Sequence, residues 1–346
     1  MAVSLGWAKR VVKRHGSAVR LQHQQGMQMS RYWAFFSLWL FCGLACAQAS
    51  GERVLKIVVP FGPGGGSDFL ARLIAPKLSE ALKETVVIDN RPGAGGTVGT
   101  DFVAKSAPDG QTLLLSDSGA YSISPALYPK LSYGPKDLAP VINLAIFGNV
   151  LVAHPKLPAN NLSELLALEK SQPGKLSYGS SGNGASPHLT AELFKTATGI
   201  RLTHVPYKGS GPAINDLVSG HIDLMFTGYA TVSGLIKSGR LKPLAVTSQN
   251  RLPSLPDTAT VAEAGFAGFS SFISQGVFAP AATPKERVQR LNREIAAVLR
   301  HPEVLEKMRQ SSLEPHDNTP EQFVSWLQAQ SQQWAKVIRE GGITPD

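Results

Sequence analysis

The sequence predicts an α/β protein in which two lobes of mostly parallel sheet, flanked by helices, enclose a cleft. Short apolar segments alternate with amphipathic segments along most of the 346 residues. Two longer extended runs, 141–154 and 269–280, have no helical face and are interpreted as crossings between the lobes. Glycine-rich loops follow two of the strands. A chain of this length can build two lobes with separate cores.

The first alternating block supplies most of one lobe. Val54–Val59 is apolar enough for a buried strand, and Leu70, Ile74 and Leu78 then recur on one helical face. The same patterns predict, in order, a strand over 85–88, a helix over 97–107, a turn at 108–110 and a strand over 112–115.

The second block lies between the two extended runs and repeats this pattern. Predicted helices cover 162–170, the segment from Pro187, 213–218 and 232–237, and predicted strands cover 176–178, 203–205, 222–226 and 244–247. The predicted lobes are therefore discontinuous. Residues 48–148 and 273–346 form the first lobe, and residues 149–272 form the second.

Two further helices are predicted after the second crossing, and both carry the same start signal. Thr283 and Thr319 each offer a capping hydroxyl, followed by proline at the first helical position and Glu or Gln at the third. Their apolar faces would return the chain to the first lobe about a hinge.

The first 47 residues are interpreted as an N-terminal extension and an export signal. Residues 32–47 are apolar and uncharged, and 45–47 supplies the small residues that a signal peptidase recognises. Because this stretch is shorter than the ~20 residues of a membrane-spanning helix, a leader cleaved after Ala47 or Ala49 is favoured over an anchor. The mature protein is then expected in the periplasm.

Two questions about this leader stay open. Residues 1–26 are out of place ahead of an export signal, whereas a start at Met27 or Met29 would leave a short N-terminal region with Arg31. A true start at Met27 or Met29 is therefore expected. A lipid on Cys46 is also conceivable, although Gly43 stands where a bulky aliphatic residue is usual.

Charge and cysteine usage exclude several functions. All six basic residues before Gln48 lie in a segment without acids, so the 34 basic and 25 acidic residues of the chain leave a net charge of +3 after cleavage. That value is too small to indicate a nucleic-acid partner. Both cysteines lie in the leader, which fits an oxidising compartment and excludes thiol catalysis, disulfides and cysteine metal sites.

The loop from Pro60 to Asp68 is the most informative segment. It joins a strand to a helix, and ligands of open α/β sheets bind beyond the carboxyl ends of the strands. The amides of 64–68 and the positive end of the helix suit an anion. The loop lacks the phosphate-loop and dinucleotide spacings, and a plain turn capped by Ser67 or Asp68 is the alternative.

A second loop, Tyr178 to His188, has the same context. Ser186 is expected to cap the following helix and Pro187 to occupy its first turn. Two amide-rich helix starts would then face each other across the cleft. This arrangement suits a small molecule with an anionic group at each end, or one carboxylate and a polar tail.

Weaker candidates surround these loops. Asp117 and Ser118 follow the third strand and should point toward the cleft, and Asp68 with Asp117 is conceivable as an acid–base pair. Tyr207 would close the cleft, whereas Lys208 is interpreted as a solvated surface charge. The histidines have no metal-binding spacing, and no nucleophile elbow occurs. No catalysis, metal or cofactor is therefore expected.

A set of motifs spanning essentially the whole mature chain resembles the Bug (TctC) family, the substrate-binding proteins of tripartite tricarboxylate transporters. The motifs are Pro60-Phe61 with Gly64-Gly65-Gly66-Ser67-Asp68, Asn90-Arg91-Pro92-Gly93-Ala94-Gly95-Gly96, Ala107-Pro108-Asp109-Gly110, Tyr178-Gly179-Ser180-Ser181-Gly182 and His204-Val205-Pro206-Tyr207-Lys208-Gly209. The resemblance implies a type II-like periplasmic binding fold, a monomer, and delivery of an organic acid to membrane components of a transporter.

The resemblance also implies ligand contacts on both sides of the cleft. On one side these are Phe61, Gly64, Gly65, Ser67 and Asp68, and on the other Ser181, Gly182, Asn183, Ala185 and Ser186. Asp117, Ser118, Tyr207 and Thr227 complete the predicted set.

Thr227 marks a departure from the family pattern. Many relatives carry an acidic residue there, which in some meets a ligand amino group. Its absence favours dicarboxylates, tricarboxylates, aromatic acids or nicotinate-like acids, although Asp117 can substitute and keeps amino acids open.

Two other functions stay open at this point. One is a regulator that presents its ligand to a sensor protein. The other is a periplasmic hydrolase that would use Asp68 and His188.

Overall fold

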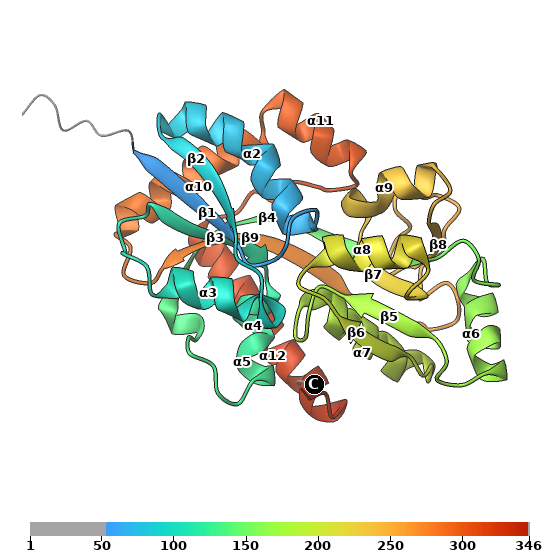
Figure 1. The fold of residues 1–346 in the computed structure, drawn as a ribbon. Coiled ribbons are helices and arrows are strands. Elements are labelled where there is room, and N and C mark those ends of the chain that lie inside the picture. Colours follow the sequence, from blue (N-terminus) through green and yellow to red (C-terminus); the bar gives the residue numbers. More distant parts are fainter. Residues whose placement is uncertain (1–52, 345–346) are drawn as a thin grey trace, which may run out of the picture. The chain divides into compact units, whose positions relative to one another are not determined.

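The computed structural model describes residues 53–344, which form one compact unit from Val54 onward (Figure 1). The predicted extension, leader, cleavage sites and both cysteines lie outside the described residues. Within 53–344, none of the helices combines the length and apolarity that crossing a membrane requires.

A single curled sheet of nine strands organises residues 53–344, in the order β2-β1-β3-β9-β4-β7-β5-β6, with β8 also paired to β4. The first half contains β1 (Val54–Val59), β2 (Thr85–Asn90), β3 (Thr112–Asp117) and β9 (Phe272–Pro280). The second half contains β5 (Ser177–Ser180), β6 (Thr203–Pro206), β7 (Leu224–Gly228) and β8 (Lys242–Val246). Figure 1 shows the second half in the green and yellow middle of the chain.

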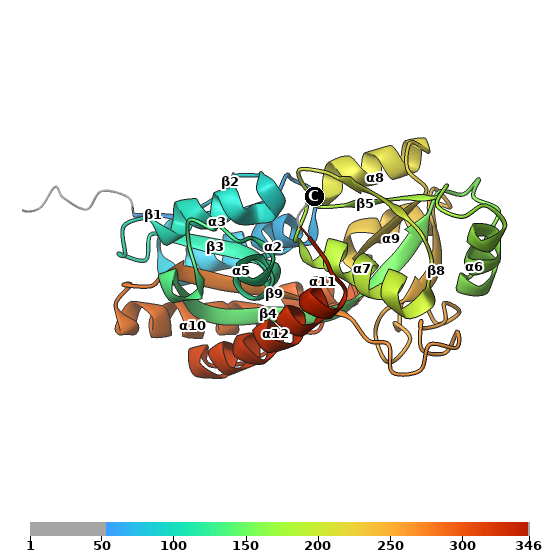
Figure 2. The ribbon, with the colours of Figure 1, turned by 90° about the horizontal axis from the view of Figure 1, so that it is seen from below.

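Strand β4 (Leu138–Ala153) belongs to both halves. It pairs with β9 as far as Gly148 and with β7 from Asn149 onward, antiparallel in both cases. Figures 1 and 2 show β4 and β9 running side by side from one half into the other. The predicted α/β fold is confirmed. The sheet is mixed, because β4 leads the chain out of the first half and β9 leads it back, so these two strands run antiparallel. The exact lobe boundaries stay a prediction.

Helices cover both faces of each half, because alternate residues of the strands point to opposite sides. In the first half, α2 (Gly66–Leu82) and α10 (Lys285–Leu299) share a core with Ile57, whereas α3 (Thr97–Ala104) and α12 (Pro320–Glu340) share one with the adjacent Val58. In the second half, α6 (Leu162–Ser171) and α7 (Ser186–Thr198) cover one face and α8 (Ser210–Ser219) and α9 (Tyr229–Lys237) the other. Shorter pieces are α4 (Gly119–Ser122), α5 (Ser124–Leu127), η1 (Ala94–Gly96) and η2 (Pro135–Asp137).

The two predicted threonine caps have different outcomes. At Thr319 the full capping box forms, since the hydroxyl accepts from the Gln322 amide and the Gln322 side chain accepts from the Thr319 amide. At Thr283 the prediction was wrong. Helix α10 begins at Lys285 after Pro284, and the Thr283 amide donates instead to the Pro280 carbonyl in a turn.

Two other helix boundaries and one unpredicted helix correct the sequence analysis. Helix α3 ends at Ala104, three residues before the predicted 107. Helix α7 is preceded by Ala185 as its cap, so Ser186 is its first residue and does not cap it. Helix α11 (Pro302–Gln310) was not predicted, because only Val304 and Met308 of this short polar segment are buried.

Candidate functional site

A small cavity lies between the two halves of the sheet. Its volume is about 30 Å³, room for one or two water molecules. Fourteen residues line it: Phe61, Gly65, Gly66, Ser67, Asp68, Asp117, Phe147, Ser181, Pro187, Ser210, Thr227, Gly228, Ile273 and Gln275.

Four helices begin at this cavity. Gly66 opens α2, Pro187 lies in the first turn of α7, Ser210 opens α8 and Gly228 caps α9. Each follows the carboxyl end of a strand, which is where α/β folds place helix starts. The positive dipole ends of all four helices therefore favour an anion in the cavity.

The side chains around the cavity add hydrogen-bonding groups but no positive charge. Neither lysine nor arginine occurs among its fourteen lining residues in the described structure. The Ser67 hydroxyl donates to Oε1 of Gln275 at 2.7 Å. Gln275 lies on β9, so this bond ties the start of α2 to a crossing strand. Phe147 and Ile273 provide apolar surface from the two crossing strands.

Asp68 shapes the first loop through a complete set of partners. It accepts hydrogen bonds from the Gly64 amide, from the Asn90 side chain and from Arg72, each at 3.0 Å. Burial opposes ionisation of this carboxyl, yet the Arg72, Gly64 and Asn90 hydrogen bonds hold its pKa below the ordinary value. Asp68 is thus an ionised residue that positions the loop.

Asp117 has a different environment at the end of β3. Its Oδ1 accepts from the Gly119 amide at 3.0 Å, and its Oδ2 accepts from the Ser186 amide of α7 at 3.3 Å. Burial raises the pKa of Asp117 to about 6, although the Ser186 and Gly119 amides oppose this shift. The carboxyl therefore links the two halves without a cationic partner in the residues described.

Segments of the two halves also touch across the cleft. The Gly62 amide donates to the Lys208 carbonyl at 2.8 Å, and the Tyr128 hydroxyl donates to the Asn183 carbonyl at 2.8 Å. Gly95 has φ +62° and packs so tightly that a Cβ would overlap the Asn183 carbonyl oxygen. These contacts define a closed arrangement of the cleft.

The structure brings half of the predicted site residues to the cavity. Phe61, Gly65, Ser67, Asp68, Asp117, Ser181 and Thr227 line it. The others, Gly64, Ser118, Gly182, Asn183, Ala185, Ser186 and Tyr207, lie close in the chain but do not line it.

Local contacts explain where these other residues lie. The Tyr207 hydroxyl donates to Asp216 on α8 at 2.7 Å, which draws the ring away from the cavity. The Ser118 amide donates to the Ser274 carbonyl beneath the loop. Asn183 meets Gly95 and Tyr128 at the edge of the cleft.

Seven lining residues were missed by sequence reasoning: Gly66, Phe147, Pro187, Ser210, Gly228, Ile273 and Gln275. Ser210 and Gly228 were detectable, because each lies between a predicted strand and the predicted helix that follows it. For Phe147, Ile273 and Gln275 no signal was available, since both faces of the crossing strands are buried and the period-two pattern is lost.

The described residues form no metal-binding cluster of three or more His, Cys, Asp or Glu. Asp68 and His188, which a periplasmic hydrolase would use, do not come together at the cavity. Asp68 is paired with Arg72, and His188 accepts the Gly184 amide through Nδ1 and stacks on His204. Ser180 lies 2.7 Å from His204 but is fully buried and accepts the Gly182 amide, so it supports the second loop.

Comparison with known proteins gives consistent matches. The family model described as "Tripartite tricarboxylate transporter family receptor" matches residues 70–343. Protein BugT of Bordetella pertussis is 37% identical over 322 residues, covering 91% of this chain and 99% of its own.

Solved structures agree with this match. A protein of R. palustris, solved with adipate, has a TM-score of 0.82 and 37% identity, covering 86% of this chain and 100% of its own. MatC of Rhodopseudomonas palustris, solved with bound malate, has a TM-score of 0.79 and 31% identity, covering 83% of this chain and 99% of its own.

Proposed function

Because this chain belongs to the tripartite tricarboxylate transporter receptor family, we propose that it captures a small organic acid in its cleft for uptake. The relatives solved with adipate and malate support a dicarboxylic acid as the ligand class. The proposed site consists of the cavity-lining residues, with Ser67, Ser181, Ser210 and the amides around Gly65 and Gly228 meeting the carboxylates.

One observation carries this proposal: four helix N-termini converge on a cavity that has no lysine or arginine. An anion bound there is stabilised by oriented amides and hydroxyls, and hydrogen bonds to a charged acceptor are about twice as strong as neutral ones.

Capture requires the two halves to separate. A cavity of about 30 Å³ is too small for a dicarboxylic acid, and backbone contacts close the cleft above it. The two halves act as the lobes predicted from the sequence, and β4 and β9 act as the hinge between them. Bound acid then stabilises the closed state through contacts made only there.

Export and delivery complete the proposal. The leader directs the chain to the periplasm and is cleaved there. The closed protein presents its acid to the membrane components of a tripartite transporter, as the family description implies, and releases it chemically unchanged.

Calorimetric titration tests the proposal. The purified protein is unfolded and refolded to remove carried ligand, then titrated with malate, adipate, citrate, benzoate, nicotinate and aspartate. One acid is expected to bind one to one with a micromolar Kd. Ser67→Ala should weaken it at least about tenfold, because one hydrogen bond to a charged group is worth roughly 1.5–3 kcal/mol.

Ser325→Ala on α12 is the matched control, since that serine is exposed and donates only within its own helix. It should leave the affinity unchanged. Equal loss in both variants, or no binding by a folded protein to any acid, would refute carboxylate capture. Conversion of the acid into another compound in the calorimeter cell would refute the binding role.

A further inference from the structure

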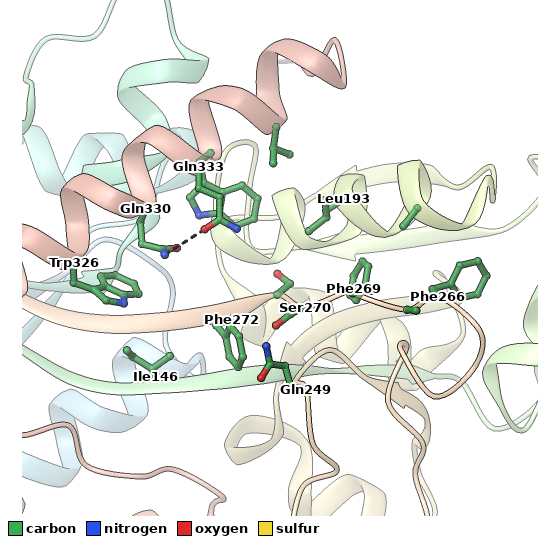
Figure 3. Close-up of a pocket in the computed structure, with 16 residues that line it drawn as sticks. Ile146, Leu193, Gln249, Phe266, Phe269, Ser270, Phe272, Trp326, Gln330 and Gln333 are labelled. Atoms are coloured by element: carbon green, nitrogen blue, oxygen red, sulfur yellow. Dashed lines mark hydrogen bonds between the residues drawn. The ribbon is translucent and has the colours of Figure 1, made fainter.

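A second and much larger hollow lies on the other side of the crossing strands (Figure 3). Its volume is about 800 Å³. On β4, Ile146 lines this groove and its neighbour Phe147 lines the cleft cavity. On β9, Phe272 lines the groove and its neighbour Ile273 lines the cavity. Alternate residues of the hinge strands thus separate two distinct sites.

Helices and a loop from both halves form the walls of the groove. Helix α12 of the first half faces α7 of the second half, and the segment 266–272 forms the floor (Figure 3). This hollow therefore is not an extension of the cleft, and the proposed carboxylate site does not account for it.

The lining of the groove has a distinct chemistry. It presents five aromatic rings, those of Phe266, Phe269, Phe272, Trp326 and Trp334. Three glutamines, 249, 330 and 333, supply amide groups, and none of the sixteen lining residues is charged. A charged molecule would lose its hydration here without gaining a counter-charge, so the lining selects an uncharged one.

Several side chains in this groove have exposed apolar surface or unused hydrogen-bonding capacity among the described residues. Phe272 is 40% exposed, although it lies on a strand whose other residues are buried. The buried Ser270 hydroxyl has no hydrogen-bond partner among the described residues, and Gln330 and Gln333 share one long bond of 3.4 Å. The groove thus combines exposed apolar surface at Phe272 with exposed amide groups at Gln330 and Gln333.

We propose that this groove is a second binding site, which takes an uncharged, planar aromatic small molecule with a hydrogen-bonding edge. Its volume lies within the roughly 300–1,000 Å³ of small-molecule sites, which are commonly aromatic with a few polar groups. The rings of Trp326 and Phe272 supply stacking surface, and the glutamine amides bond to the polar edge.

Fluorescence titration with N-phenyl-1-naphthylamine, an uncharged aromatic amine, tests this site. The dye is expected to bind one to one with a micromolar Kd and to quench tryptophan emission by energy transfer. Trp326→Ala and Ala197→Arg should each weaken dye binding at least tenfold, the first by removing a wall and the second by placing a charge at the exposed rim.

Ala297→Arg is the matched control, because Ala297 is an exposed residue of α10 outside the groove. It should leave the dye affinity unchanged. Equal affinities for Ala197→Arg and Ala297→Arg, or absence of saturable binding, would overturn the proposal. A dimer that excludes the dye and becomes monomeric in Ala197→Arg would also overturn it, since a second copy would then cover the groove.

The dye titration needs no organic acid. A protein that binds the dye but none of the acids would refute the proposed function and leave the groove site intact, and the converse result would refute only the groove site.

Discussion

At the level of single residues, the two carboxylates of the cleft have opposite electrostatics. Asp68 receives hydrogen bonds from Arg72, Asn90 and an amide, and stays ionised. Asp117 is held by the amides of Gly119 and Ser186 without a cationic partner among the described residues, and burial raises its pKa to about 6. A ligand carboxylate is therefore repelled less by Asp117 when that residue is protonated, and Asp117 makes the cleft sensitive to pH.

This difference predicts a pH dependence of stability. The pKa of Asp117 rises from an ordinary 3.8 to about 6 on folding, so the native state binds the proton more tightly. The stabilisation is fully present below pH 3.8 and is lost as the pH rises through about 6. Relative to Asp117→Asn, the wild-type free energy of unfolding should increase by about 2 kcal/mol as the pH falls from 7 to 4.5.

Denaturant unfolding of both proteins at each pH measures this difference. Because all other groups titrate in both proteins, the subtraction isolates Asp117. Parallel pH profiles for wild type and Asp117→Asn would contradict the assigned environment of this carboxyl.

At the level of elements, loop contacts across the cleft control closure. Gly95 belongs to η1 in the first half and packs against the Asn183 carbonyl of the second loop. Its φ of +62° and the absence of room for a Cβ together require glycine.

Gly95→Ala is accordingly expected to hold the cleft partly open and to weaken acid binding at least tenfold. Gly174→Ala is a matched control, because Gly174 has φ +76° and nothing within 4 Å of a Cβ. The control carries the same kind of backbone strain and should retain wild-type affinity in calorimetry. Similar affinities for the two variants would show that the loop contact does not govern closure.

Elements also show how far sequence patterns reach. The alternation of strands and helices, the two crossing runs and the loops at Gly64 and Ser181 could be read directly, because local periodicity and strand-end glycines determine them. The caps could not. Thr283 and Thr319 carry the same motif, but only at Thr319 does the chain enter the helix with the hydroxyl facing the free amides.

The cavity-lining residues on the crossing strands could not be predicted, because tertiary structure places them. Gln275 meets Ser67 across 208 residues of sequence, and both faces of its strand are buried. Its register against β3 and β4, which decides the side that faces the cleft, follows from strand pairing and leaves no local signal.

At the level of the whole molecule, the crossing strands separate the proposed acid-binding cleft from a groove lined by uncharged residues. Both sites draw their walls from the two halves, so a change in the angle between the halves alters both. The central claim is that organic-acid binding and closure of the cleft are one process.

Small-angle X-ray scattering tests this claim most directly. The radius of gyration is measured for the ligand-free protein and again with a saturating amount of the acid identified by calorimetry. We predict a smaller radius with the acid present, and little contraction in Gly95→Ala. One-to-one binding in wild type with an unchanged radius of gyration would contradict capture by closure.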